Sequence, residues 1–544
     1  MCEQVGRGAR IALCVVVALA VSVSVFGQPV SASGTGGQAA QTAGGAVVKK
    51  LSIDEAVQLA LEQNLSLQVE RVNPRIQDMN TAAVRAAWRP NLISSISGGS
   101  ADSPAGNIFS GTGVTQTSDT ASWSFGASQT LPTGGNYQVT WGTQRYKTNS
   151  LFDNINPRLN SSLNLSYTQP LWRNFRIDTT RQQLLVSGKN REISDVQLRQ
   201  TVLTTVRSVK SAYWTLSYTV SSLVVQQQSL DLARESLRNS EARVKIGTMA
   251  PMDVIQSQAE VAAREESVIR AQAAVAQAED QFRGLIMDPQ TPGFWEMKFD
   301  LTDSPAFQAQ AVDVDAAVRN ALSARTDLTQ QKKTLEENDI TLRYMHNQTK
   351  PDVNVNVKYG LSAQGGTQLA YDYSDVLNPV FLGQAGQVGY RSMFSSLLKN
   401  DYPQWSFALT FGYPIGNSAA EANEARARLQ YTQAQTQLRA AELSVTTEVR
   451  NAARNVTTNQ KRVESTRASR ELQEKKLEAE QKKFAAGMST TFFVLQAQRD
   501  LAQAKDAELS AVLDYTRSLV DFETVQQAPT FGGSGGVVIS SGGQ

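Results

Sequence analysis

The segment KIGTMAPMDVIQSQ, residues 245–258, has a counterpart 240 positions later in AAGMSTTFFVLQAQ, residues 485–498. Matched positions carry identical residues: Gly247 and Gly487, Val254 and Val494, Gln256 and Gln496, Gln258 and Gln498, and, just beyond the segments, Ala262 and Ala502. Each segment lies between long stretches that favour helix. Because glycine readily takes the left-handed conformation that ends a helix, both segments are predicted to be turns between two helices.

The helices that lead into these turns are predicted to be very long. Residues 179–245 and residues 419–486 contain no proline, and a single helix over either range would be roughly 100 Å long. In the first range, apolar residues recur at spacings of three, four and seven, which is typical of coiled-coil packing. They are Ile193, Val196, Val202, Leu203, Val206, Val209, Leu216, Val220, Leu223 and Leu230.

The chain is predicted to be internally duplicated. The segment SIDEAVQLALEQNLSL (52–67) resembles VDVDAAVRNALSARTDL (312–328) at an offset of 261, and the same offset carries Arg89-Pro90 onto Lys350-Pro351. A repeat of this length indicates a duplicated unit rather than a solenoid of short units.

Each repeat contains a helix, strands, a very long helix, a turn and a second helix. We place repeat 1 at residues 50–290 and repeat 2 at residues 312–528, with an irregular connector over residues 291–311. Ser52 and Glu55 have the spacing of a capping box, so the first helix is expected to start there and to run to about Trp88.

The strand segments alternate apolar and polar residues. One side of each strand carries the apolar residues Leu163, Leu165 and Tyr167; Val353, Val355, Val357 and Tyr359; or Trp405, Phe407, Leu409, Phe411 and Tyr413. Such a pattern fits a soluble sheet with one buried face. It also fits a transmembrane barrel with apolar residues toward lipid and polar residues toward the lumen, which the aromatic enrichment and a secretory signal favour.

Each repeat clearly supplies two strands. Residues 122–146, around LPTGG (131–135), form an additional candidate hairpin, and the sequence does not say whether it joins the barrel. Four strands cannot enclose a pore. Several chains are therefore expected to share one barrel.

The two ends of the chain are predicted to lie outside this fold. Residues 1–32 read as a signal peptide, with Arg7 and Arg10 before an apolar run and Val30-Ser31-Ala32 as a cleavage site. Residues 33–49 form a Gly/Ala/Gln/Ser-rich flexible linker, and residues 529–544 form a disordered Gly/Ser-rich tail. After the signal, no apolar run is long enough for a membrane helix.

The composition argues against several function classes. The 52 basic and 50 acidic residues give no reason to expect a nucleic-acid partner. Both cysteines, Cys2 and Cys14, lie in the predicted signal peptide, and His346 is the only histidine. The mature chain is thus expected to be neither an enzyme nor a metal or cofactor protein.

In the order and spacing of these motifs the chain resembles the TolC-type channels of the outer membrane efflux protein family. The resemblance covers about residues 50–528. Besides the two turns, it rests on Arg89-Pro90-Asn91-Leu92 between helix and strand, on Gln169-Pro170-Leu171 before the long helix, and on Leu519-Val520-Asp521-Phe522-Glu523.

The resemblance implies an α+β membrane protein that forms a homotrimer. Its β-barrel, shared between protomers in outer-membrane lipid, would continue into a long α-helical coiled-coil tunnel in the periplasm. It would serve as the export duct of a tripartite efflux or type I secretion system, meeting a periplasmic adaptor that links it to an inner-membrane pump. The alternative is a trimeric surface adhesin or structural stalk, although helices here precede and follow both sets of strands.

The family pattern also assigns candidate site residues. It places adaptor-docking tips at Ile246, Gly247 and Thr248 and at Ala486, Gly487 and Met488. Read from the residues alone, both turns can also be plain helix stops, although their matched positions at one end of the particle favour a docking surface. The helix–strand junctions are expected at Pro90, Pro170, Pro351 and Pro414.

The candidate periplasmic gate departs from the family prototype, which has two acidic residues just past the second tip. Phe493 and Gln496 occupy the matching positions, their counterparts in repeat 1 are Asp253 and Gln256, and Ser489 stands where a basic latch residue is expected. The resemblance therefore implies an apolar or hydrogen-bonded gate with Phe493 at the constriction. The alternative is that Phe493 simply packs between helices.

Overall fold

The computed structural model describes residues 48–104, 115–150, 153–304, 307–372, 374, 380–413, 415–416 and 418–527. The predicted signal peptide, the tail and the expected junction at Pro414 lie outside the described residues. So does the predicted linker, except Val48 and Lys49.

The first helix is interrupted, contrary to the prediction of one helix to about Trp88. Ser52 caps α1 (Ile53–Gln63) with the expected capping box, but the chain becomes extended at Asn64 before α2 (Leu65–Ala86) begins. The Asn64 side chain accepts a hydrogen bond from the Leu67 amide and donates one to the Leu285 carbonyl, 3.0 Å away. In repeat 2, α5 (Val314–Ala324) and α6 (Thr326–Gln348) are likewise separated by one residue.

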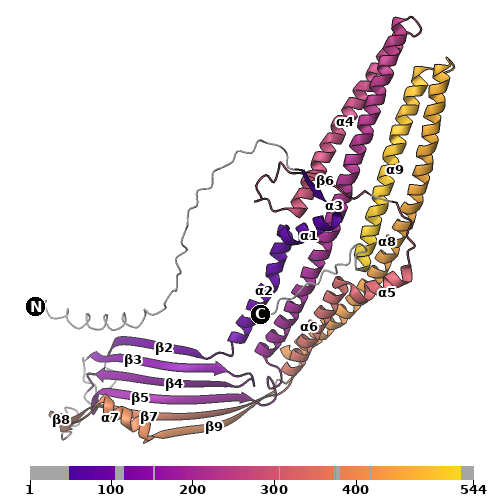
Figure 1. Ribbon diagram of the computed structural model, residues 1–544. Helices are drawn as coiled ribbons and strands as arrows, with labels where there is room; N and C mark the ends of the chain where they lie inside the picture. Colours follow the sequence, from indigo (N-terminus) through magenta and orange to yellow (C-terminus); the bar gives the residue numbers. More distant parts are fainter. Residues whose placement is uncertain are drawn as a thin grey trace, which may run out of the picture. The chain divides into compact units, whose positions relative to one another are not determined.

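Two long helical hairpins follow the predicted pattern closely. Helices α3 (Thr179–Lys245) and α8 (Ala419–Ala485) each contain 67 residues. They pack against α4 (Pro251–Ile286) and α9 (Thr491–Gln526), and the two hairpins meet along α3 and α9 (Figure 1). Within the described part of the chain, no helix has a stretch both long and apolar enough to span a bilayer.

Two apolar cores hold the hairpins to the shorter helices. In the first, Phe282 of α4 lies among Tyr213 and Leu216 of α3 and Ala56 and Ala60 of α1. The second core repeats this arrangement with residues of α5, α6, α8 and α9, namely Ala317, Ala321, Leu328, Val445, Val449, Ala453, Val456, Val463, Ala511, Tyr515 and Phe522. Phe282 and Phe522 are 240 positions apart, the same offset that relates the two turns.

A short parallel ladder joins two segments that the sequence analysis treated as irregular. Strand β1 (Val48–Leu51) pairs with β6 (Lys298–Leu301). Val48 and Lys49 are thus not part of a flexible linker, and the connector is not wholly irregular. The Tyr213 hydroxyl fastens this ladder to α3, because it donates to the Leu51 carbonyl and accepts from the Asp303 amide at 3.1 Å each.

All the longer strands belong to one antiparallel sheet. Repeat 1 contributes β2 (Asn91–Pro104), β3 (Thr115–Thr130), β4 (Asn136–Thr148) and β5 (Ile155–Pro170), and repeat 2 contributes β7 (Asp352–Asp372), β8 (Val380–Val388) and β9 (Pro403–Gly412). The order is β2-β3-β4-β5-β7 (Figure 1), after which β7 pairs with β9 through its first half and with β8 through its second half. The additional hairpin therefore joins the sheet, and each repeat supplies more than the two strands expected.

The two faces of the sheet differ in chemistry as the alternation predicted. Residues that pair across strands share a face, so one row carries Phe125, Trp141, Leu163 and Leu361. The next row, on the opposite face, carries Ser124, Gly142, Ser162 and Ser362. The polar face is hollowed by a cavity of about 950 Å³, which is lined mainly by Ser, Asn, Gln and Gly residues.

A short helix that the sequence analysis did not predict covers part of the apolar face. Helix α7 (Tyr390–Lys399) buries Met393 and Leu397 against Leu159 and Ala363. It ends at Asn400, which has the left-handed conformation and accepts a hydrogen bond from the Tyr359 hydroxyl at 2.8 Å.

Candidate docking tips, gate and junctions

Both long helices end in the same backbone motif. Gly247 has φ +77° and Gly487 has φ +75°. After α3, the Thr248 amide donates to the Arg243 carbonyl (2.9 Å) and the Gly247 amide to the Val244 carbonyl (3.0 Å). After α8, the corresponding bonds run from Met488 to Lys483 (2.8 Å) and from Gly487 to Phe484 (3.1 Å). These pairs of bonds define a Schellman motif, so the predicted turns are confirmed as glycine-dependent helix ends.

The conformation of Gly247 can be tested against another glycine of the same hairpin. Gly247→Ala is expected to lower the free energy of unfolding by about 1–2 kcal/mol, because a Cβ is disfavoured at positive φ. Gly284→Ala, inside α4, is expected to raise it by about 0.5–1 kcal/mol, because a new Cβ there meets no atom within 4 Å. Denaturant unfolding of the two purified variants should show opposite signs, and equal effects would contradict the assignment.

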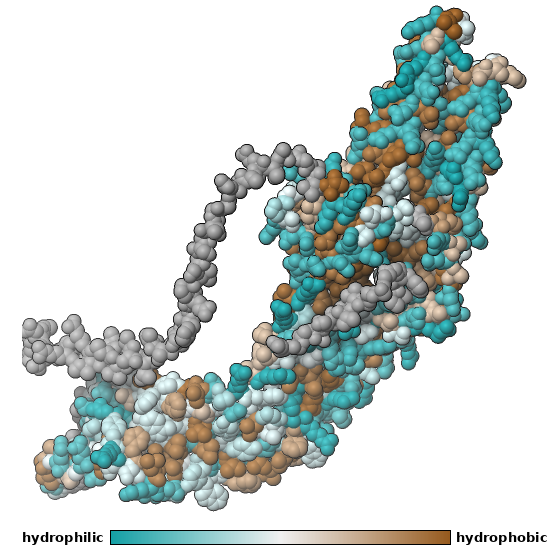
Figure 2. All heavy atoms as spheres, viewed as in Figure 1, coloured by the Kyte–Doolittle hydropathy of each residue, from teal (hydrophilic) through white to brown (hydrophobic). Residues whose placement is uncertain are grey.

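Each tip exposes apolar side chains to solvent. Ile246 is 73% exposed beside Met252 and Ile255 at the first tip. Met488 is 79% exposed beside Phe492 and Phe493 at the second tip. Figure 2 shows hydrophobic atoms at the α3–α4 turn, away from the sheet. The Arg243 guanidinium, in the last turn of α3, lies 4.5 Å from the Phe484 ring centroid in the last turn of α8, so the two long helices meet just before the tips.

The candidate gate residues lie near the starts of α4 and α9, the second helices of the two hairpins. Phe493 is 54% exposed in the single chain and meets Phe492 edge-on, with ring centroids 5.6 Å apart. Gln496 follows one turn later on α9, whereas Asp253 and Gln256 lie on α4, in the other hairpin. Ser489 donates a hydrogen bond to Glu480 at 2.9 Å, so it acts within its own tip.

A polar network near the gate joins the two hairpins, and the sequence analysis missed it. Glu260 of α4 is only 8% exposed. Its carboxylate accepts a hydrogen bond from Arg264 at 2.7 Å and lies 3.5 Å from a guanidinium nitrogen of Arg499 on α9. We call Glu260, Arg264 and Arg499 the hairpin latch. Glu260 and Arg499 are 239 positions apart in the sequence, so no local sequence pattern could have revealed that they pair.

The hairpin latch continues through Gln496 into α8. Arg499 donates to the Gln496 side-chain oxygen at 2.9 Å, and the Gln496 amide donates to Asp500 at 2.8 Å. Asp500 also accepts a hydrogen bond from Lys476 at 2.7 Å, and this bond holds the pKa of the Asp500 carboxyl below its usual value. The candidate gate residue Gln496 therefore connects the latch to both helices of the second hairpin.

The second contact between the hairpins lies deeper along α3 and α9. Asp506 of α9 accepts hydrogen bonds from Ser222 at 2.8 Å and from Tyr218 at 3.4 Å. Burial raises the pKa of the Tyr218 hydroxyl, so it remains a donor well above neutral pH. Arg207 of α3 also pairs with Asp521 of α9 at 2.7 Å, so the hairpins are tied by polar contacts at several levels.

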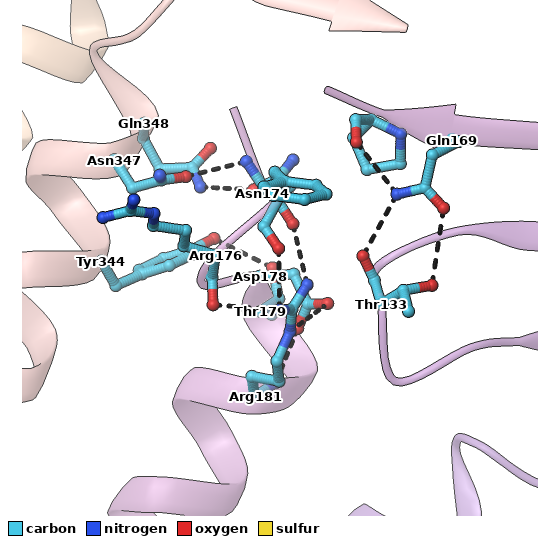
Figure 3. Close-up of polar contacts among 12 residues, drawn as sticks. Thr133, Gln169, Asn174, Arg176, Asp178, Thr179, Arg181, Tyr344, Asn347 and Gln348 are labelled. Carbon is cyan, nitrogen blue, oxygen red and sulfur yellow. Dashed lines mark hydrogen bonds and ion pairs between the residues drawn. The ribbon is translucent and has the colours of Figure 1, made fainter. Parts of the chain in front are cut away.

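The expected helix–strand junctions at Pro90, Pro170 and Pro351 coincide with strand ends, and Pro414 lies outside the described residues. Pro90 and Pro351 immediately precede β2 and β7, and Pro170 is the last residue of β5. At the Pro170 junction the Arg181 guanidinium donates to the backbone carbonyls of Asn174, Phe175 and Arg176 at 2.8–3.0 Å (Figure 3).

Residues of repeat 2 and of the additional hairpin complete this junction. Asn347 accepts a hydrogen bond from the Asn174 amide at 2.8 Å, and Gln348 donates to the Asn174 side chain at 2.7 Å (Figure 3). On the other side, the Gln169 amide donates to the Thr133 carbonyl at 3.2 Å. The junction therefore binds β5, α6 and the β3–β4 turn together.

Comparisons with known proteins agree with this fold. A family model described as outer membrane efflux protein matches residues 136–286 and 320–525, one segment in each repeat. None of the curated proteins compared with the chain matches it.

Several solved structures share the fold at low sequence identity. The outer-membrane channel OprN is 16% identical with a TM-score of 0.61, over 87% of this chain and 89% of OprN. The outer membrane protein VceC from Vibrio cholerae is 14% identical with a TM-score of 0.60, over 87% of this chain and 95% of VceC. The CmeC outer membrane channel of Campylobacter jejuni is 14% identical with a TM-score of 0.59, over 87% and 85% of the two chains.

The family match covers more than half of the chain, in both repeats. It supports a channel and gives no support to the adhesin or stalk alternative. The chain therefore belongs to the outer membrane efflux protein family, whose members are homotrimeric outer-membrane export channels that work with a periplasmic adaptor and an inner-membrane pump.

Proposed function

We propose that this chain, as a homotrimer, is the passive exit duct of a tripartite efflux or type I secretion system and catalyses no reaction. Cargo would pass over the polar face of the sheet, where uncharged Ser, Thr, Asn and Gln residues dominate. Such a lining hydrogen-bonds water and solutes without a strong preference for either charge. Energy would come from the inner-membrane pump.

We propose that the adaptor docks on the two tips, Ile246–Thr248 and Ala486–Met488. The single observation that carries this proposal is that two matched turns at the ends of the hairpins expose Ile246 and Met488. Exposed apolar side chains that cluster together commonly mark an interaction surface. Because the Arg243–Phe484 contact holds the ends of α3 and α8 together, one adaptor can engage both tips.

A charge placed on each tip tests the docking proposal. The double variant Ile246→Asp, Met488→Asp is expected to weaken adaptor binding by about 30-fold or more, because central interface residues contribute about 2 kcal/mol or more each. Binding of the detergent-purified trimer to the adaptor of the same organism can be measured by surface plasmon resonance.

The matched control is Ile246→Leu, Met488→Leu, which keeps the apolar character and is expected to bind as the parent does. Both variants should elute as trimers from a sizing column. Unchanged adaptor binding by the aspartate variant would show that the tips are not part of the adaptor interface and are plain helix ends.

We propose that the gate lies where Phe493 and Gln496 of three copies converge. Phe493 is largely uncovered within one copy, so it is available to line a constriction or to pack against a neighbour. Phe493→Asp would place a ring of three carboxylates there. In planar bilayers, divalent cations at the periplasmic side are expected to block the variant more strongly than the parent. An unchanged block would indicate that Phe493 packs between helices.

A further inference from the structure

We propose that each copy contributes six strands at membrane level, so that three copies close an 18-stranded barrel in which β2 of one copy pairs with β9 of the next. This inference rests on the homotrimer of the proposed function. The sequence pattern indicates two strands from each repeat, which would be twelve in a trimer, and leaves open whether the additional hairpin joins the barrel. The structure provides a wider sheet than the sequence pattern indicated.

The described sheet is six strands wide both next to the helices and farther from them. Strands β2, β3, β4, β5 and β7 are consecutive neighbours. Beside β7, strand β9 pairs with residues 352–361 and β8 pairs with residues 366–372, so a sixth strand is present at both levels, and residues 362–365 of β7 lie between the two ladders. At the level next to the helices the outermost strands are therefore β2 and β9.

Among the described residues, the two outermost strands have no strand partner on one side. Every residue of β2 and of β9 is exposed. An open sheet edge leaves backbone amides and carbonyls unpaired, and such edges do not occur facing lipid. In an outer-membrane protein both edges must therefore be covered, and a second copy of this chain supplies a strand for each.

Strand direction allows closure with six strands from each copy. All neighbouring pairs in the sheet are antiparallel, so β2 leads away from the helices and β9 returns toward them. When β9 of one copy meets β2 of the next, the new pair is antiparallel too. An even number of strands per copy is what a regular antiparallel barrel requires.

The outer faces of the two edges also match. Leu92 of β2 and Trp405 of β9 lie in one cross-strand row with Val139, Leu165 and Tyr359. On β9, Trp405, Phe407, Leu409 and Phe411 alternate with polar or small residues. At this level the apolar row that would face lipid therefore runs from one edge of the sheet to the other.

The β3–β4 hairpin makes close contacts with the helix–strand junction at Pro170 and with the segment before β2. A Cβ at Gly134, in the β3–β4 turn, would lie 2.8 Å from the Asn174 carbonyl oxygen and 2.7 Å from an Arg181 nitrogen. At the same end of β3, the Gln129 side-chain amide donates to the Trp88 carbonyl at 2.7 Å, just before β2. These contacts hold β3 and β4 between β2 and β5.

The added strands widen the barrel. Neighbouring strands lie about 4.8 Å apart and tilt by about 40° in outer-membrane barrels. On this geometry a backbone cylinder of eighteen strands is about 36 Å across, against about 24 Å for twelve strands. The outer exit would thus be wide enough for cargo considerably larger than a hydrated small molecule.

Disulfide cross-linking tests which edges meet. Cys2 and Cys14 are the only cysteines and can be replaced by alanine. Single cysteines at Leu92, Ser94 or Ile96 are then combined with one at Trp405, Phe407 or Leu409, because the register between copies is set by the barrel shear. Across an antiparallel pair the Cα atoms are about 4.5–5.5 Å apart, within the range that a disulfide bridges.

We expect at least one combination to give a ladder of covalent dimers and trimers on oxidation. The matched control pairs Ala127→Cys with Val139→Cys, which are partners within one copy and should give no ladder. Cryo-electron microscopy of the same trimer should count eighteen strands. The inference would be wrong if the control pair formed its disulfide within one copy while no β2–β9 combination formed one between copies. It would also be wrong if the barrel contained twelve strands. A trimeric duct with twelve strands would leave the proposed function intact.

Discussion

Replacing Phe282 by alanine is expected to lower the free energy of unfolding by about 3–5 kcal/mol. Its side chain is 0% exposed, and its ring contacts Tyr213 and Phe299 edge-on at centroid distances of 5.9 and 5.3 Å. Phe282 thus joins α4 to α3 and to the β1–β6 ladder, and its removal leaves a cavity between three elements. Denaturant unfolding of the purified trimer, followed by circular dichroism, measures the change.

Two further substitutions serve as comparisons. Gln277 is exposed on the same helix, so Gln277→Ala is expected to change the free energy of unfolding by less than about 0.5 kcal/mol. Phe522→Ala removes the counterpart of Phe282 from the second core and is expected to cost a similar amount. A loss below about 1 kcal/mol at Phe282 would show that the first core does not hold this region together.

Breaking the hairpin latch is expected to shift the balance between a closed and an open periplasmic end by about 30-fold. Glu260→Ala leaves Arg264 and Arg499 close together without their shared carboxylate. Removing one partner of a fully buried pair costs about 3–5 kcal/mol, but Arg499 is 41% exposed and solvent screens it, so about 2 kcal/mol is the appropriate scale. That free energy corresponds to the stated shift in the equilibrium constant.

Two measurements report the effect. Single-channel recordings of the Glu260→Ala trimer should show a larger mean conductance than the parent. Spin labels at Ala250 and Ala486, one on each tip, should show a longer and broader distance distribution. The control is Asp514→Ala, which removes a carboxylate from the 2.6 Å pair with Arg462 inside the second hairpin. If that control opens the channel as much as Glu260→Ala does, the latch has no special role.

Local sequence signals accounted for the helical hairpins. The N-cap residues Asp178 and Ser418 and the left-handed Gly247 and Gly487 mark the ends of α3 and α8, and each acts within a few residues of its own position. The duplication and the alternating strands were also readable, because the offsets of 240 and 261 and a period of two need no knowledge of contacts.

Long-range contacts accounted for what the sequence analysis missed or left open. At the break after α1, the Asn64 side chain caps α2 locally through the Leu67 amide and also donates to the Leu285 carbonyl, 221 residues away. The hairpin latch joins residues 239 positions apart, and strand β1 pairs with β6 at a similar separation in the sequence.

The amino-acid sequence by itself determined where helices, strands and turns lie along most of this chain, because capping, turn conformation and periodicity act between near neighbours. Only the tertiary structure decided which of these elements meet. It placed the β3–β4 hairpin inside the sheet, set the sheet width at six strands, and brought Glu260 to Arg499. These outcomes depend on backbone hydrogen bonds and on a buried carboxylate that pairs with a distant guanidinium, and such contacts leave no periodic pattern in the sequence of either partner.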